Sequence, residues 1–184
     1  MELDECIKGR RSIRAYKSDS IPKDKIEAIL EAGVWAPTGM NKQPWKFIII
    51  ENKETIKFIS DESKKIIAQV MPQMKSWYDT PEDVVCYNAP VLILICTKID
   101  KEGGDINLLD SVLASQNMFL KAHELGIGSC YMGFVSLLAK KPEILKKVGV
   151  PDGYEVQVPL ILGYPKSKSP KGKRNSPEIL KWIK

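Results

Sequence analysis

Hydrophobic and polar residues alternate along the chain with two different periods, which separate predicted helices from predicted strands. Apolar residues at helical spacing predict helices over residues 2–8, 23–34, 53–75, 108–125 and 136–148. Short apolar runs bounded by turn signals predict strands over residues 45–51, 91–97, 129–132 and 155–163. Helices and strands that alternate without an internal repeat predict an α/β or α+β fold built around a central sheet.

Two of these segments are unusually apolar. Every residue from Val91 to Cys96 is apolar, so this strand is expected to be buried on both faces. The helix over residues 108–125 is apolar on most sides and carries small residues at Ser111 and Ala114. It is expected to be the most buried helix, or one that packs against its own copy in a dimer.

Three segments interrupt the pattern. Acidic residues and glycines at 101–105 predict a turn. The helical period breaks at 77–81, where a loop is expected to present Trp77 and Tyr78, either as surface or interface packing, which is favoured, or as an aromatic lid. Residues 164–184 are rich in Lys, Ser and Pro and are too polar to fold alone.

The composition narrows the class of protein. The chain has 184 residues, of which 43% are hydrophobic and 28% are charged, as expected for one globular domain or one protomer of an intertwined oligomer. The net charge of +5 favours anionic partners but is too small to indicate nucleic acid. We expect a cytoplasmic protein without a membrane segment, because the chain has no long apolar run and four scattered, unpaired cysteines: Cys6, Cys86, Cys96 and Cys130.

Few side chains offer catalysis of their own. The single histidine, His123, lies in the most apolar helix, where a structural or interface role is favoured over that of a base. The chain has no zinc-protease motif, nucleophile elbow, P-loop or dinucleotide fingerprint, and no metal site is predicted. If the protein is an enzyme, we expect a bound cofactor to carry the reaction.

Two basic stretches stand out, residues 10–14 (RRSIR) and residues 171–174 (KGKR). Guanidinium, ammonium and hydroxyl groups together are the donors that hold a phosphate. The alternative is a solvated basic edge that binds nothing.

The first basic stretch and the loop over residues 36–45 (APTGMNKQPW) together closely resemble two motifs of the FMN-dependent nitroreductase family. Residues 126–133 (GIGSCYMG) and residues 162–165 (LGYP) match later parts of that family, in the same order. The resemblance extends from about residue 5 to residue 181. It implies an α+β sandwich with a central, mostly antiparallel sheet flanked by helices.

The resemblance also implies a domain-exchanged homodimer with two FMN molecules at the subunit interface. Each chain would be one FMN-binding domain over residues 1–184, with residues 165–184 extending across the partner. The polar tail suits such an exchange.

Site residues follow from the motif positions. The resemblance implies that Arg10 contacts the FMN phosphate, that Ser12 lies close to it, and that Arg11 adds its backbone and charge. Arg14 would face the pyrimidine edge of the flavin, where a fixed cation stabilises the negative charge of the reduced ring. Basic residues of the tail would close the phosphate site: Lys171, Lys173 and Arg174.

Two further groups complete the implied site. The partner's loop would line the ring and ribityl chain with Pro37, Thr38, Gly39 and Asn41. For residues 43–45, which follow, a role as scaffold that anchors this loop is favoured over direct contact with the cofactor. Backbone amides after the glycine-containing turn would meet flavin N5 and O4, which brings in Tyr131, Met132 and Gly133.

The resemblance implies two half-reactions at one site, in which a reduced donor leaves before an oxidising acceptor binds. NAD(P)H is the favoured donor, with ferredoxin as the alternative, and nitro- or quinone-like compounds are the expected acceptors. No residue matches the asparagine that some family members place against the ring, so the donor stays open. Alternatives are a flavin-dependent dehydrogenase or a flavin-fragmenting enzyme on the same fold. A basic nucleic-acid-binding module is disfavoured, because aromatic and basic residues do not interleave.

Overall fold

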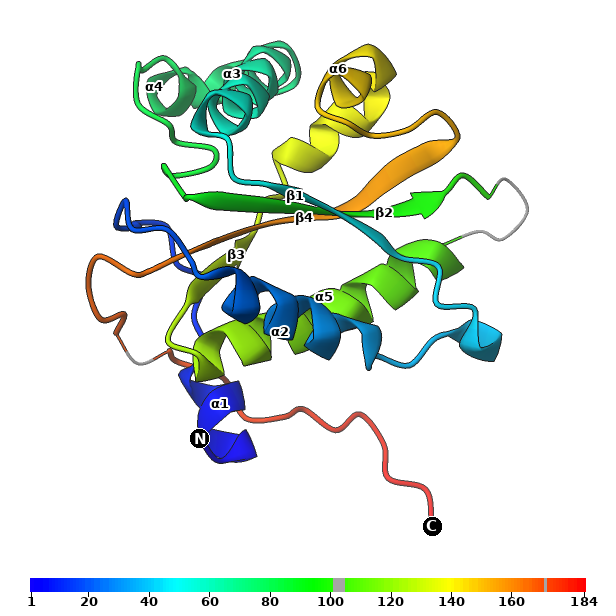
Figure 1. Ribbon diagram of the computed structural model, residues 1–184. Coiled ribbons are helices and arrows are strands. Elements are labelled where there is room, and N and C mark those ends of the chain that lie inside the picture. The colour runs from blue at the N-terminus through cyan, green and yellow to red at the C-terminus, as the bar shows by residue number, and fades with distance from the viewer. Residues whose placement is uncertain (101–104, 171) are drawn as a thin grey trace.

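The computed structural model describes residues 1–100, 105–170 and 172–184, and shows one sheet between two layers of helices (Figure 1). The predicted turn at 101–105 lies almost wholly outside the described residues. The strands are β1 (Lys46–Ile50), β2 (Val91–Lys98), β3 (Gly128–Tyr131) and β4 (Tyr154–Gly163). Their order is β1-β2-β4-β3, and every neighbouring pair is antiparallel. The predicted α+β fold with an antiparallel sheet is therefore confirmed.

The central strand β2 is buried on both faces, as its sequence predicts. Successive side chains of a strand point to opposite faces, and the two core clusters divide β2 in that way. Leu92, Leu94 and Cys96 pack on one face, and Val91, Ile93 and Ile95 pack on the other. Each is at most 1% exposed, and burying such a side chain contributes about 1.5–3 kcal/mol.

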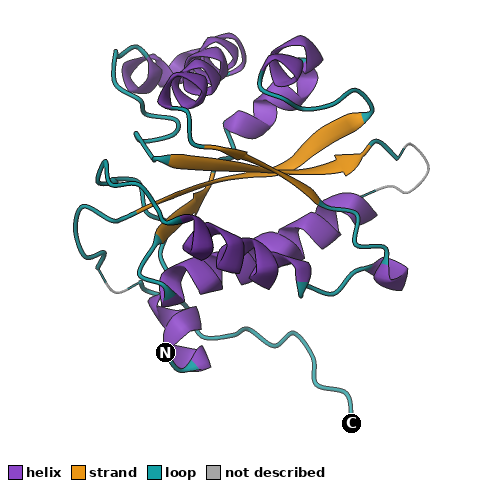
Figure 2. Cartoon of the chain, in the orientation of Figure 1, coloured by secondary structure: helices purple, strands orange, loops and turns teal. Residues whose placement is uncertain are grey.

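Helices cover both faces of the sheet (Figure 2). One layer contains α3 (Lys53–Val70), α4 (Lys75–Tyr78) and α6 (Pro142–Lys147), with the short turns η2 (Pro72–Met74) and η3 (Val135–Lys140). The other layer contains α2 (Lys23–Val34) and α5 (Ile106–Glu124), with α1 (Leu3–Gly9) near the end of α5. Within the described ranges, no helix is both long and apolar enough to cross a membrane.

Two predicted helices are interrupted, and in each the cause is a proline. The helix predicted over residues 53–75 ends at Val70, and the one predicted over 136–148 is divided at Lys141. Met71 and Lys141 precede Pro72 and Pro142, and both leave the helical region, with φ/ψ of −137°/60° and −130°/66°. Proline clashes with a helical residue before it, which the hydrophobic period alone does not register.

The loop predicted at 77–81 begins later than expected, because Trp77 and Tyr78 lie in α4. Trp77 packs on Phe134, with ring centroids 4.9 Å apart. Both aromatic residues of α4 lie partly buried against the core. Packing, rather than an open lid, is therefore their role in the single chain.

The tail leaves the body beside α1 and runs below α5 in Figure 1. Its apolar side chains are exposed, including Leu180 at 101% and Trp182 at 73%. The tail thus has no core of its own.

The four cysteines are buried free thiols.

Candidate functional site

The basic segment Arg10–Arg14 follows α1 and lies beside β3. The amide of Ile13 donates to the carbonyl of Ser129 at 3.0 Å. Because side chains of an extended segment alternate in direction, Ile13 is half-buried while Ser12 and Arg14 are exposed. The segment therefore presents a hydroxyl and a guanidinium to the outside of the sheet.

The chain beyond β4 returns to the same segment. The amide of Lys17 donates to the carbonyl of Tyr164 at 2.8 Å, and the amide of Lys166 donates to the carbonyl of Ala15 at 3.0 Å. These bonds bring the base of the tail against the basic segment. The two basic stretches of the sequence thus meet through pairing of their neighbours.

Arg11 connects the two stretches. Its guanidinium donates to the carbonyls of Lys8 at 2.7 Å, Arg10 at 2.6 Å and Pro170 at 3.1 Å. A Cβ on Gly172 would lie 3.0 Å from the Arg11 Cζ, so the tail passes directly against this group. Arg11 therefore holds the tail through Pro170 and its own segment through Lys8 and Arg10, a role that the sequence did not predict.

The remaining cations of this region are open to an anion. Arg10 and Arg14 make no ion pair with a carboxylate in the part of the chain that the structure describes. Lys173 and Arg174 follow Gly172 in the tail and are exposed, and Arg174 donates to the carbonyl of Lys173 at 2.8 Å. Lys171 lies outside the described residues. A phosphate is the ligand that such a cluster suits.

A small cavity of about 270 Å³ joins the basic segment to the end of β3. Arg14 and Tyr87 line it together with the predicted Tyr131, Met132 and Gly133. The structure therefore brings together two groups of residues that the sequence proposed separately.

The three predicted residues that line this cavity differ in their free hydrogen-bonding groups. The amide of Met132 donates to the carbonyl of Pro159 at 2.9 Å, and its side chain is 5% exposed. The amide of Gly133 has no acceptor among the described residues. Tyr131 is 48% exposed, and its hydroxyl lies 3.1 Å from that of Ser136. Gly133 therefore offers an amide without an acceptor in the described part of the chain, whereas the amide of Met132 is used by β4.

The loop with Pro37, Thr38, Gly39 and Asn41 lies elsewhere. The amide of Gly39 donates to Asp110 in the second turn of α5, whereas the basic segment lies near the opposite end of that helix (Figure 1). The 19 residues of α5 span roughly 28 Å. One chain therefore does not bring this loop and the basic segment to a single cofactor.

This loop has an unusual backbone. Met40, Asn41 and Gln43 have positive φ angles of 51°, 54° and 45°, a region that costs an L-residue about 1–2 kcal/mol. Gln43 stabilises the loop through its amide, 3.3 Å from Thr38 Oγ1, and its side chain, 3.0 Å from Asn41 Oδ1. Strained backbone of this kind gathers at functional sites.

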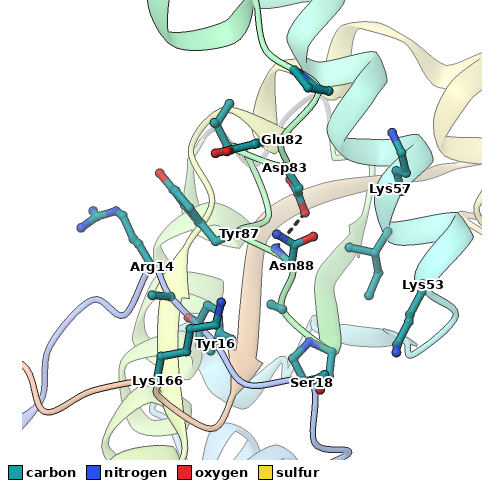
Figure 3. A pocket seen from close by; sticks show the side chains of 16 residues that line it. Arg14, Tyr16, Ser18, Lys53, Lys57, Glu82, Asp83, Tyr87, Asn88 and Lys166 are labelled. Carbon is teal, nitrogen blue, oxygen red and sulfur yellow. Dashed lines mark hydrogen bonds between the residues drawn. The ribbon is translucent and has the colours of Figure 1, made fainter.

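A second cavity, of about 960 Å³, lies on the other side of Arg14 and Tyr87, which line both cavities. Figure 3 shows Arg14 and Lys166 at one side and Lys53 and Lys57 at the other, where the two lysines point in opposite directions. Lys57 is paired with Asp61 at 2.6 Å. The charges do not converge on one point, so this cavity is not the phosphate site.

A carboxylate in that cavity organises the loop that carries Tyr87. Asp83 accepts hydrogen bonds from the Ser60 hydroxyl at 2.5 Å and from the amides of Cys86 at 2.7 Å and Asn88 at 3.0 Å. Tyr87 and Asn88 have φ angles of 54° and 53°. Asp83 therefore holds Tyr87 in a strained conformation beside the small cavity.

His123 lies near the basic segment but is not placed as a base. A Cβ on Gly9 would lie 2.6 Å from His123 Nε2, so the ring packs directly on the end of α1. Burial, and then the guanidinium groups of Arg10 and Arg11, lower the pKa of His123. The imidazole is therefore a neutral packing group, as the sequence favoured.

The lowered pKa predicts how stability changes with pH. Between the folded pKa and the ordinary value of about 6.5 the unfolded chain binds more protons. The free energy of unfolding should then fall as the pH drops below about 6.5, with a slope of at most one proton. His123→Gln should flatten this dependence between about pH 7 and pH 5 in urea denaturation. An unchanged slope would contradict the assignment.

Sequence reasoning missed three residues: Tyr87, Asp83 and Asp110. Asp110 had a visible signal, since it is one acidic residue within an otherwise apolar stretch of α5. Tyr87 and Asp83 had none, because their roles depend on a loop conformation that local composition does not reveal.

The family model described as the Nitroreductase family matches residues 7–164. A protein of Archaeoglobus fulgidus, provisionally named NADH dehydrogenase/NAD(P)H nitroreductase, is 32% identical over 171 residues, covering 90% of this chain and 88% of that protein. An iodotyrosine deiodinase of Thermotoga neapolitana is 28% identical over 181 residues, covering 94% of each.

A solved structure agrees with these relatives. A nitroreductase with bound FMN from Bacteroides fragilis superimposes with a TM-score of 0.85 at 29% sequence identity. The match covers 100% of this chain and 98% of that one. The similarity therefore includes the basic segment, the loop and the tail.

Proposed function

The chain belongs to the nitroreductase family, and we propose that it is a homodimeric FMN-dependent oxidoreductase that takes electrons from NAD(P)H and reduces nitro- or quinone-like compounds. The single observation that carries this proposal is the cavity lined by both Arg14 and Gly133, whose amide has no acceptor among the described residues. The relatives support both the cofactor and the donor, since one is named for NAD(P)H and one has FMN bound.

The residues present fit the phosphate of FMN. Arg10 and Ser12 would contact it, and Lys173 and Arg174 would close the site from the tail, with Lys171 proposed as a further contact. Arg11 keeps this arrangement together, because its guanidinium donates both to Pro170 of the tail and to the carbonyls of Lys8 and Arg10.

The donors also fit a flavin ring. Flavin accepts two electrons as a hydride and passes them to an acceptor, and negative charge develops at its pyrimidine edge on reduction. Arg14 would stabilise that charge, and the Gly133 amide would hydrogen-bond the ring near N5 and O4. The chain itself then needs no nucleophile, in keeping with the neutral, packed His123.

The second half of the site would come from a partner subunit. Pro37, Thr38, Gly39 and Asn41 lie at one end of α5, and the basic segment lies near the other. Two copies related by a two-fold axis perpendicular to α5 would place the start of one α5 beside the end of the other. The exposed face of this helix supports such packing, with five exposed apolar residues: Ile106, Leu108, Leu109, Val112 and Leu113.

The tail supports the same assembly. Its four apolar side chains are 63–101% exposed in the single chain, and residues of this kind seldom stay in water as a group. We propose that residues 165–184 extend across the partner, where Ile179, Leu180, Trp182 and Ile183 become buried.

A flavin potential tests the role of Arg14. Arg14→Gln should lower the reduction potential of bound FMN by on the order of 20–40 mV, because one exposed cation near the ring is lost. The measurement is an anaerobic spectroscopic titration against a reference dye. Lys17→Gln, which removes an exposed cation three residues away, should leave the potential unchanged. Equal potentials in all three proteins would contradict the assignment.

The donor is tested directly. Purified protein should show the absorbance of oxidised FMN, and anaerobic NADH or NADPH should bleach it. Flavin that stays oxidised with both nucleotides would leave FMN binding intact and favour ferredoxin or a dehydrogenase role. A colourless protein that takes up no FMN would overturn the proposed function.

One relative favours a second candidate. The similarity to the deiodinase of Thermotoga neapolitana extends over nearly the whole chain, so reductive removal of iodide from a halogenated phenol is the alternative activity. Release of iodide from iodotyrosine, faster than reduction of a nitroaromatic compound, would favour it.

A further inference from the structure

Asp110 is a buried carboxylate with incomplete hydrogen bonding. Asp110 is 5% exposed, whereas the nearby apolar residues Leu109 and Val112 of α5 are 60% and 47% exposed. Oδ1 accepts from the amide of Gly39 at 3.3 Å. Oδ2 is buried and has no donor in the described part of the chain. A buried polar atom without a partner costs about 1–3 kcal/mol, so this oxygen calls for an explanation.

The loop that Asp110 contacts is the strained one. Met40 and Asn41 follow Gly39 directly, and both have left-handed backbone. Gly39 also packs closely on the first turn of α5, since a Cβ there would lie 3.5 Å from Ile106 Cγ2. The hydrogen bond from Gly39 to Asp110 is the polar link between this loop and the helix.

The amide of Met40 is the nearest candidate donor along the chain. It donates to no acceptor within the described ranges, whereas the amides of Asn41 and Lys42 donate to the carbonyls of Thr38 and Gly39. Two consecutive amides beside one carboxylate allow each oxygen to accept one bond. The free chain makes only one of them.

We infer that Asp110 is a positioning residue that holds the loop over residues 37–41 for the flavin of the partner subunit, and that Oδ2 accepts the Met40 amide once the dimer and its cofactor are assembled. This inference rests on the proposed function. The unpartnered oxygen destabilises the single chain, and assembly removes this free-energy cost. Asp110 therefore couples flavin binding to the conformation of the loop.

The variant Asp110→Asn separates the two oxygens. It retains one acceptor for Gly39 and removes the second, so the apo protein should melt at the same or a higher temperature. Its FMN dissociation constant should nevertheless rise about 10-fold, because the second bond cannot form. A side chain with a merely structural role would change stability and affinity in the same direction.

Two more variants complete the test. Asp110→Ala loses both acceptors, so hydrogen exchange of a peptide covering residues 36–43 should be faster in the apo protein, whereas Asp110→Asn should match wild type there. In the FMN-loaded dimer this peptide should be better protected in wild type than in Asp110→Asn. Asp105→Asn, an exposed change of equal charge at the start of α5, should alter none of these measurements.

Each outcome decides the inference. Wild-type FMN affinity in Asp110→Asn, or parallel losses of melting temperature and affinity, would overturn it. Unchanged exchange in apo Asp110→Ala would also overturn it. If wild type binds no FMN, the proposed function fails, while the exchange measurement on the apo proteins still decides whether Asp110 holds the loop.

Discussion

Arg10→Ala is expected to weaken FMN binding by about 10- to 150-fold, because a charge-assisted hydrogen bond to the phosphate contributes roughly 1.5–3 kcal/mol. Fluorescence titration of FMN measures the dissociation constant. Lys8→Ala is the matched control, since this lysine is exposed two positions earlier and is paired with Asp4 at 2.6 Å. Equal affinity in Arg10→Ala and wild type would remove Arg10 from the phosphate site.

Mixed dimers of two variants test whether each flavin site is formed by both subunits. Asn41→Gly removes the side chain of the loop without opposing its left-handed backbone. If each flavin is held by Arg10 of one chain and Asn41 of the other, a mixed dimer contains one intact site. After Arg10→Ala and Asn41→Gly are unfolded together and refolded, about a quarter of all sites should regain wild-type affinity. No regain would place both residues on the same chain's flavin.

Leu109→Glu is expected to convert the dimer to monomers and to release FMN with it. Leu109 is 60% exposed in the single chain and lies on the apolar face of α5. In a symmetric dimer the substitution buries two unpaired carboxylates, each at a cost of several kcal/mol. Sedimentation velocity with detection at the flavin absorbance measures assembly and cofactor content together.

The control for this variant lies on the other side of the sheet. Val70→Glu, at the end of α3, changes an apolar residue of similar exposure, 55%. It should remain a dimer with FMN bound. A dimeric, yellow Leu109→Glu protein would show that the interface lies on another face.

Individual residues show how far the sequence predicts this site. The order of the motifs predicted Arg10, Arg14 and Gly133 as members of one site, and the structure brings Arg14 and Gly133 to one cavity. Arg11 is different, because its guanidinium donates to a carbonyl 159 residues away along the chain. Such contacts are absent from any local pattern.

The amino-acid sequence predicts most of the helices and strands of this protein and the family to which it belongs. The period of apolar residues marks helices and strands because residues at a fixed spacing share one face, as in β2, whose alternate residues enter the two cores. The prolines at 72 and 142 are also present in the sequence, but the apolar period continues past them and so does not show that each interrupts a helix.

The way in which distant segments meet is visible in the folded chain alone. The fold places the tail against the basic segment, the loop over residues 37–41 at the far end of α5, and the Asp110 carboxylate beside that loop. These arrangements depend on packing between segments separated by tens to more than a hundred residues. Local sequence determines which face of an element is apolar, whereas long-range packing determines which carbonyl or amide a given side chain reaches.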